Sequence, residues 1–219
     1  PDNYRPTPTP TLYNYVDNTR KTPTGFEVFP IFMHMAIDLA VSQRSTADNR
    51  AILIGGWDEL HRLHVVDGAA GKWGADEFYE HIYRLADKWN LTFIMFESGV
   101  GMQGGFEHNL TTWAQYHKKR RLVCKPMPVN RSISKQRKLE MCIQPLIESE
   151  SLYVNTPLWR NSPLAHEIRF FNVEASNNQD DCLDCVEMLA RTHKMRSKDL
   201  RNTRTYRHTT VNSVYGGTR

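Results

Sequence analysis

Two acidic residues lie where apolar segments of the sequence end. Asp38 stands near the end of the apolar run 31–39, and Glu97 directly follows the apolar run 91–96. A charge at the edge of a buried strand costs several kcal/mol unless another group pairs with it. If the two strands are parallel neighbours, both carboxylates emerge at the carboxyl edge of the sheet, where α/β proteins place their functional sites.

A third group of acids falls at the start of a predicted helix over 179–194. Asp180, Asp181 and Asp184 lie in its first two turns, where capping of the helix N-terminus is the ordinary role of acids. Asp180 and Asp184 are four residues apart, so their like charges repel each other on one helix face in the absence of a cation. Together with the strand-end acids they form a donor set typical of hard divalent metals. Two such ions can activate a water and stabilise the leaving oxygen of a phosphodiester.

Hydrophobic periodicity predicts the elements that must position these acids. Three apolar runs with short connections predict an antiparallel meander of strands over 31–39, 51–57 and 63–67. After Gly74, short apolar strands alternate with segments of helical period, which predicts an α/β fold with a mixed sheet flanked by helices. The later strands are expected over 91–96, 122–127 and 152–154, and the helices over 75–89, 105–118, 135–149, 163–171 and 179–194.

Composition divides the chain into three parts. Residues 1–30 hold six of the eleven prolines, interleaved with Thr, and predict an extended, poorly packed linker or arm. Residues 31–195 form the predicted domain, and 196–219 form a tail. The segment 191–219 carries eight Lys or Arg against one acid, although the whole chain has a net charge of only +4. Such a tail contacts phosphate or an acidic partner, or is simply solvated.

Cysteine spacing and hydropathy exclude other classes of protein. Cys182 and Cys185 form a C-x-x-C inside a helix-like segment, but no second Cys or His pair stands at zinc-ligand spacing, so we expect reduced core cysteines. No stretch reaches the roughly 18 apolar residues that a membrane span needs, and no secretory signal opens the sequence, so we expect no membrane association. Because residue 1 is Pro rather than Met, we expect a piece of a longer polypeptide.

In order and spacing, these motifs resemble the nuclease domain of the large terminase subunit of tailed bacteriophages, which has an RNase H-like fold. The matching residues are Ala36-Ile37-Asp38, Phe96-Glu97 and Asp180-Asp181-Cys182-Leu183-Asp184. The last group resembles an Asp-Asp-x-x-Asp-Ala helix, with Cys185 in place of Ala. Segments 134–137, 145–148 and 164–171 lie where the family has a Lys-x-Arg loop, a helix and the approach to its last acidic helix. The resemblance covers roughly 31–195.

The resemblance implies a metal-dependent endonuclease that cuts concatemeric double-stranded viral DNA during genome packaging. It implies Asp38, Glu97 and Asp181 as catalytic residues. These three, with Asp180, are the implied ligands of Mg²⁺ or Mn²⁺, and two ions are expected. Asp181 is favoured over Asp180 as the direct ligand, although the sequence does not settle the choice. The expected mechanism is two-metal phosphodiester hydrolysis.

Two further acids are weaker candidates for the site. Asp184 is expected either to support the metal ligands without binding a metal or to pack the helix. Asp48, ten residues after Asp38, has a metal or supporting role or is a surface loop acid.

Basic residues beside hydroxyl groups provide candidate DNA contacts. The loop 130–138 contains Arg131, Lys135 and Arg137 among serines, and such groups bind phosphate without reading base sequence. The resemblance favours DNA contact for this loop. The run 118–121 carries four more bases and is either a solvated face or a second DNA contact.

The resemblance also implies partners. Large terminase subunits carry an ATPase motor ahead of the nuclease. Segment 68–73 is too short for a phosphate-binding loop and ends in Trp73, which has no hydroxyl for Mg²⁺, so we expect no ATP hydrolysis. The expected partners are double-stranded DNA, an N-terminal ATPase motor, the portal and the small terminase subunit, in the cytoplasm of the infected bacterial host.

Two other functions remain open. One is that of another RNase H-like enzyme, of the resolvase or integrase type. The other is a non-catalytic docking module for the portal or small terminase subunit, in which the acids serve only as helix caps. Cation dependence separates these classes, because a docking module neither cuts DNA nor needs Mg²⁺ or Mn²⁺.

Overall fold

The computed structural model describes residues 3–6, 12–23, 25–39, 50–98, 103–128, 132–172, 174 and 180–193. Within these residues, no helix is long and apolar enough to cross a membrane. The predicted basic tail, 196–219, lies outside the described residues.

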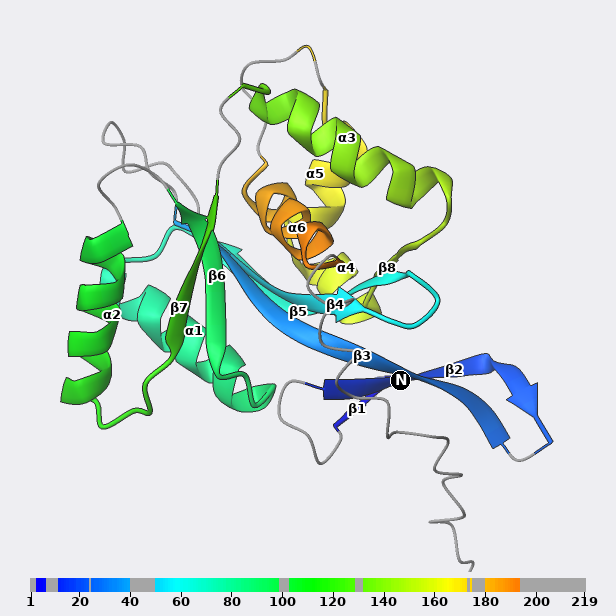
Figure 1. The fold of residues 1–219 in the computed structure, drawn as a ribbon, viewed down its shortest axis with the longest axis horizontal. Coiled ribbons are helices and arrows are strands. Elements are labelled where there is room, and N and C mark those ends of the chain that lie inside the picture. The colour runs from blue at the N-terminus through cyan, green and yellow to red at the C-terminus, as the bar shows by residue number, and fades with distance from the viewer. Residues whose placement is uncertain are drawn as a thin grey trace, which may run out of the picture.

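In the described part of the chain, one mixed sheet of eight strands forms the middle layer (Figure 1). Its strands are β1 Tyr4–Pro6, β2 Leu12–Thr22, β3 Gly25–Asp38, β4 Arg50–Trp57, β5 Leu63–Gly71, β6 Phe93–Ser98, β7 Val123–Pro128 and β8 Leu152–Val154. β1 to β5 pair in chain order, each antiparallel to the next. β6 then pairs in parallel with β3, β7 with β6, and β8 with β5. The predicted meander followed by parallel strands is confirmed.

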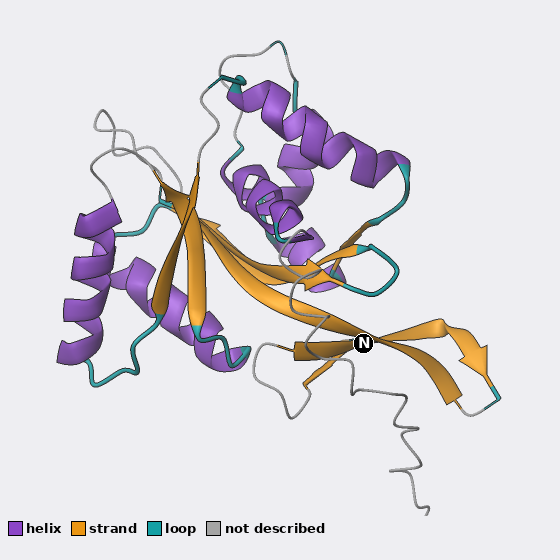
Figure 2. Ribbon diagram, in the orientation of Figure 1, coloured by secondary structure: helices purple, strands orange, loops and turns teal. Residues whose placement is uncertain are grey.

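Helices cover both faces of this sheet (Figures 1 and 2). The helices are α1 Ala75–Lys88, α2 Gln103–Tyr116, α3 Lys135–Glu148, α4 Thr156–Asn161, α5 Leu164–Phe170 and α6 Asp181–Arg191. α1 and α2 pack on one face, and α3 to α6 pack on the other. The predicted helices are present with ends shifted by a few residues. The short helix α4, which has Pro157 in its first turn, was not predicted.

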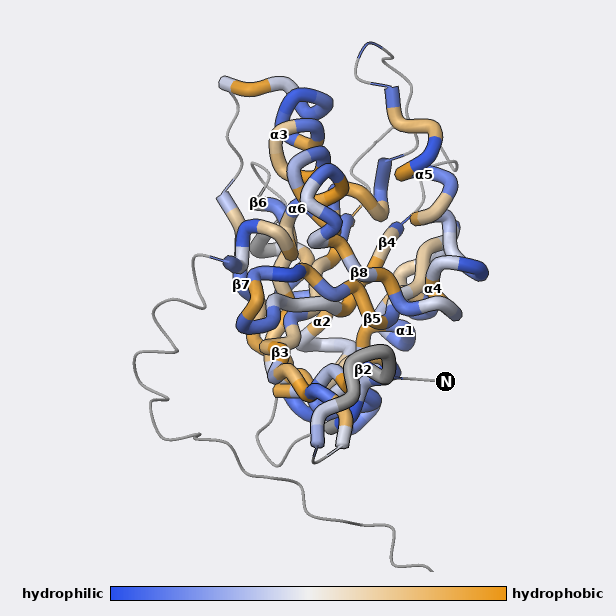
Figure 3. The backbone as a smooth tube through the Cα atoms, turned by 90° about the vertical axis from the view of Figure 1, so that its right-hand side faces the viewer, coloured by the Kyte–Doolittle hydropathy of each residue, from blue (hydrophilic) through white to orange (hydrophobic). Residues whose placement is uncertain are grey.

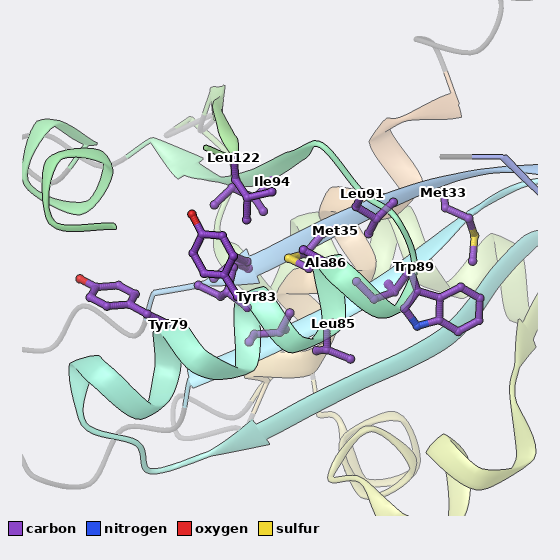
Figure 4. Close-up of a cluster of buried hydrophobic side chains, with 14 of the residues drawn as sticks. Met33, Met35, Tyr79, Tyr83, Leu85, Ala86, Trp89, Leu91, Ile94 and Leu122 are labelled. Carbon is purple, nitrogen blue, oxygen red and sulfur yellow. The ribbon is translucent and has the colours of Figure 1, made fainter. Parts of the chain in front are cut away.

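The alternation of side chains along β3 divides the core in two. Met33, Met35 and Ile37 point into the core under α1 and α2, whereas Ala36 points into the core under α6. Figure 4 shows the first of these cores, where Tyr83 of α1 lies over the strands. Hydrophobic stretches follow β4 and β5 through the middle of the molecule (Figure 3). Each face of the sheet therefore has its own apolar layer, and β3 contributes to both.

The N-terminal segment differs from its prediction. Within 1–30, the described residues include β1, β2 and the first part of β3, all paired into the sheet. Tyr4 and Tyr13 are buried in the core. The expectation of a poorly packed arm is therefore wrong for these residues, because aromatic side chains have a high preference for paired strands and bury a large area there. The domain boundaries themselves remain predictions.

Candidate active site

Strand pairing places Asp38 beside Glu97. β3 and β6 are parallel neighbours in which Ile37 lies opposite Phe96, so the next register position joins Asp38 to Glu97. Two residues earlier, Ala36 and Met95 both point into the core under α6. Because side chains alternate along a strand, Asp38 and Glu97 face the α6 side as well. Two strand-end carboxylates therefore share one edge and one face of the sheet.

The first turns of α6 lie against the end of β3. The Cys185 thiol donates to the carbonyl oxygen of Ala51 at 3.6 Å, and Ala51 is paired with Asp38 in the sheet. Burial, with a smaller contribution from the Asp38 charge, raises the pKa of the Cys185 thiol. Cys182 and Cys185 are fully buried free thiols, which confirms the prediction of reduced core cysteines for this pair.

Lys135 of α3 joins two acids of α6. Its Nζ lies 2.7 Å from Asp180 Oδ1 and 2.5 Å from Asp184 Oδ2. Burial raises the pKa of Asp184 to about 6, although Lys135 acts in the opposite direction. The second oxygen of Asp184, Oδ1, is buried without a hydrogen-bond partner among the described residues. A buried carboxylate oxygen of this kind requires a further positive or donor group.

Lys138, one turn further along α3, pairs with the strand-end acid. Its Nζ lies 2.5 Å from Glu97 Oε1. Burial lowers the pKa of Lys138, but the hydrogen bond to Glu97 and the charges of Glu187, Glu97 and Asp184 raise it overall. Glu187 of α6 is only 2% exposed. The two lysines of α3 thus balance part of the negative charge that β6 and α6 bring together.

Glu167 of α5 contacts the first turn of α6, next to the acidic cluster. The residue is 3% exposed, and its Oε2 accepts the backbone N–H of Leu183 at 3.0 Å. Burial raises the pKa of Glu167 to about 7, although hydrogen bonds from the start of α6 act in the opposite direction.

The donors at this edge suit a hard divalent cation by their chemistry. They are carboxylate oxygens, the ligands that Mg²⁺ and Mn²⁺ prefer, and the unpaired Asp184 Oδ1 shows that the charge there is only partly balanced. As placed in the described part of the chain, no three His, Cys, Asp or Glu side chains stand close enough together to hold a metal ion. Lys135 and Lys138 instead lie between acids of this edge as their counter-charges.

The structure thus gathers most of the predicted site residues. Asp38, Glu97, Asp180, Asp181 and Asp184 lie on elements that meet at this edge. Asp48 and Arg131 lie outside the described residues.

The predicted DNA contacts have acidic neighbours in the structure. Lys135 pairs with acids of α6, and Arg137, which is exposed, pairs with Glu140. In the run 118–121, Arg120 pairs with Asp87. This run comes just before β7, so it lies at the start of that strand, whereas Glu97 lies beside the other end of β7. These pairings favour the solvated-face interpretation of 118–121.

Three residues of the site were not predicted: Lys138, Glu187 and Glu167. Two of them had a signal in the sequence, because Lys138 follows Lys135 and Glu187 follows Asp184 by three residues, which places each pair on one helix face. Glu167 falls in the segment 164–171 that the resemblance places before the last acidic helix, but its contact with α6 was not predicted, since its partner Leu183 is 16 residues away.

Comparison with solved structures identifies the fold. The chain is similar to the human cytomegalovirus terminase nuclease domain, with a TM-score of 0.53 at 12% identity over 75% of this chain and 86% of that domain. It is also similar to the P22 large terminase nuclease domain, with a TM-score of 0.51 at 13% identity over 78% of this chain and 87% of that domain. The yeast mitochondrial Holliday junction resolvase Ydc2 aligns at a lower TM-score of 0.46 and 12% identity, over 77% of this chain and 82% of that one.

No family model matches the chain, and no curated protein sequence is similar to it. The structural similarity establishes an RNase H-like α/β fold with a curled mixed sheet. The predicted fold class is confirmed.

Proposed function

We propose that this chain is a metal-dependent endonuclease that hydrolyses double-stranded DNA, with its active site at the acidic edge. One observation carries the proposal: Asp38 and Glu97 are neighbours at the carboxyl ends of two parallel strands and face the acidic start of α6. Helix capping accounts for acids at a helix start, but it gives no reason for two carboxylates at adjacent strand ends.

Asp38, Glu97 and Asp181 are the proposed metal ligands. Burial and then Glu167 raise the pKa of the Cys182 thiol most, and the charges of Asp181 and Asp38 add to the effect, so both acids lie near Cys182. Asp180 is held by Lys135, which supports Asp181 as the direct ligand, with Asp180 and Asp184 in supporting positions. The chemistry that two Mg²⁺ or Mn²⁺ ions supply here is activation of a water and stabilisation of the leaving oxygen.

The residues of this chain have three tasks in such a reaction. The rigid pairing of β3 with β6 orients Asp38 and Glu97. Lys135 and Lys138 limit the repulsion among the acids. Lys135 remains 42% exposed, and with Arg137 and Arg131 it is proposed to contact the phosphates of the DNA backbone.

The finer proposal is that the chain acts in viral genome packaging, as the nuclease domain of a phage large terminase subunit. The order of the acidic motifs supports this, together with similarity to two terminase nuclease domains. Its proposed partners are an N-terminal ATPase motor, the portal and the small terminase subunit, in the cytoplasm of an infected bacterium, and it does not itself hydrolyse ATP.

The test is cleavage of supercoiled plasmid with Mg²⁺, with Mn²⁺ and with EDTA. The wild type should cut only with metal, and Asp38→Asn and Glu97→Gln should abolish cutting. Glu107→Gln is the matched control, because Glu107 is a surface acid paired with Arg121, and it should cut like the wild type. Absence of cleavage together with absence of metal binding would overturn the proposal in favour of a docking module.

A second substrate tests the finer proposal. A linear duplex and a four-way junction of the same length should be compared under the cutting condition. A terminase-type nuclease should cut the duplex at least as well as the junction. Strong preference for the junction would instead indicate a resolvase.

A further inference from the structure

The helix that carries the acidic cluster does not cap its own N-terminus. Asp180 occupies the N-cap position of α6, but its side chain makes no capping hydrogen bond. Its carboxylate is turned to Lys135 instead, at 2.7 Å. The first backbone N–H groups of a helix have no partner within the helix, so those of α6 need an acceptor from another element.

Glu167 of α5 supplies that acceptor. Its Oε2 accepts the N–H of Leu183 at 3.0 Å, and it also accepts from Cys182. Both donors lie in the first turn of α6, where a carboxylate is further favoured by the helix dipole. The acceptor comes from a fixed position, since Leu164 at the start of α5 is fully buried and packs in the core beneath α6.

The hydrogen bond from Leu183 to Glu167 lies next to the acids of α6. The residues that Glu167 holds, Cys182 and Leu183, lie between Asp181 and Asp184. Cys185, in the following turn of α6, contacts Ala51 of β4, the residue that pairs with Asp38 at the end of β3. The start of α6 is therefore held by two elements, β4 next to β3 and α5.

We infer that Glu167 is a positioning residue, which holds the first turn of α6 so that Asp181 stands at the right distance from Asp38 and Glu97. The inference depends on the proposed metal site, and Glu167 itself touches neither metal nor DNA. Residues that orient metal ligands in this way change metal affinity by about 10- to 100-fold when they are replaced.

The test is Mn²⁺ affinity of the folded protein, measured by titration with detection of free Mn²⁺ by electron paramagnetic resonance. Glu167→Ala, which removes the acceptor, should weaken Mn²⁺ binding by about tenfold or more. Glu167→Gln keeps an amide oxygen that can accept the Leu183 N–H, and it should bind Mn²⁺ nearly as well as the wild type. If Glu167→Ala does not fold, Glu167→Asp replaces it, because the shorter side chain draws the acceptor away from α6 and should also weaken binding.

A matched control separates positioning from general loss of stability. Asp58 is also a fully buried carboxylate that accepts backbone N–H groups, from Leu60 and Arg62, but it lies in the turn between β4 and β5. Asp58→Asn should lower the unfolding midpoint without changing Mn²⁺ affinity.

The outcomes distinguish the inference from the proposed function. If the wild type binds Mn²⁺ and Asp38→Asn does not, the metal site stands. Equal affinity of Glu167→Ala and wild type would then overturn the inference alone, as would an equal loss in Asp58→Asn. Absence of Mn²⁺ binding by the folded wild type would overturn the proposed function and the inference with it.

Discussion

Lys138 stands among carboxylates from two different elements. Its ammonium contacts Glu97 of β6 and is influenced by Glu187 and Asp184 of α6, while its side chain is only 11% exposed. Like charges gathered in a partly buried space repel strongly, and a single cation among them removes much of that repulsion. At the proposed metal site, a bound divalent ion would therefore reduce the same repulsion that Lys138 reduces.

Lys138→Gln should make the stability of the protein depend on divalent cations. We expect the variant to lose about 2 kcal/mol of unfolding free energy in EDTA, the cost of losing a hydrogen bond between charged groups. Mn²⁺ should restore more stability in the variant than in the wild type, because the ion supplies the missing charge. Thermal unfolding with EDTA and with Mn²⁺ measures both.

The control for Lys138 is a lysine on the surface. Lys119 is 43% exposed and pairs with Asp87 at 3.6 Å, so Lys119→Gln should change stability by less than about 1 kcal/mol and leave the response to Mn²⁺ unaltered. Equal responses of Lys138→Gln and wild type to Mn²⁺ would contradict the role given to Lys138.

Among the elements, β1 is linked to β5 and to the turn between β4 and β5 by a buried polar cluster, in addition to the strand pairing of β1 and β2 with the sheet. Asp58 Oδ2 accepts from Arg62 Nε at 2.5 Å and lies 3.0 Å from His64 Nε2. The other ring nitrogen of His64 is 3.2 Å from the Tyr4 hydroxyl of β1. Burial by itself raises the pKa of Asp58, but the hydrogen bonds from His64 and Arg62 and the charge of His64 outweigh it and hold the pKa at about 2.

Asp58→Ala should therefore destabilise the protein by about 3–5 kcal/mol, because it leaves the buried Arg62 without its counter-charge. Urea unfolding measures this loss. The surface acid Asp87, which is 47% exposed, is the control, and Asp87→Ala should cost at most about 1 kcal/mol. A loss of the same size for both variants would show that the cluster does not hold the N-terminal strands.

The same elements show what could be predicted from the sequence. Strands β3 to β6 and helix α1 follow clear hydrophobic periods and were predicted. β2 was missed, because the prolines before it concealed the alternation from Leu12 to Val16. The acids at the ends of β3 and β6 were identified, and their register, Ile37 opposite Phe96, was a hypothesis that only tertiary structure could test. The contacts of Lys138 and Glu167 depend on how α3 and α5 pack against α6, and local sequence does not determine this packing.

At the scale of the whole molecule, the carboxyl ends of β3 and β6 lie together with the start of α6 at one edge of the sheet. The opposite face carries α1 and α2 over an apolar core (Figure 1). The proposed site therefore lies on the α6 side of the sheet, and each face of the sheet is covered by its own apolar core. This arrangement, with helices on both faces of a mixed sheet, is consistent with the RNase H-like fold that the structural similarities establish.

His34 makes the stability of the whole fold depend on pH. Its Nδ1 is buried without a hydrogen-bond partner among the residues described. Burial, and to a smaller extent the Lys125 charge, lowers the pKa of its imidazole from 6.5 to about 4. Because the folded-state pKa is the lower one, the stabilising contribution is present above pH 6.5 and is lost as the pH falls toward 4.

His34→Leu should therefore flatten the dependence of unfolding free energy on pH. Between pH 7 and pH 4, the unfolding free energy of the wild type should fall by roughly 3 kcal/mol more than that of the variant. Urea unfolding at a series of pH values measures the difference. Parallel curves for the two proteins would contradict the pKa assigned to His34.

The central claim, that the acidic edge is a metal centre, is tested most directly by locating bound metal. Crystals grown with Mn²⁺ should be measured by anomalous diffraction, beside crystals of Asp38→Asn. We expect two Mn²⁺ peaks, about 3.5–4 Å apart, among the carboxylates of Asp38, Glu97 and Asp181, and we expect neither peak in the variant. A folded wild type with no Mn²⁺ at this edge, or with Mn²⁺ bound only elsewhere, would contradict the claim.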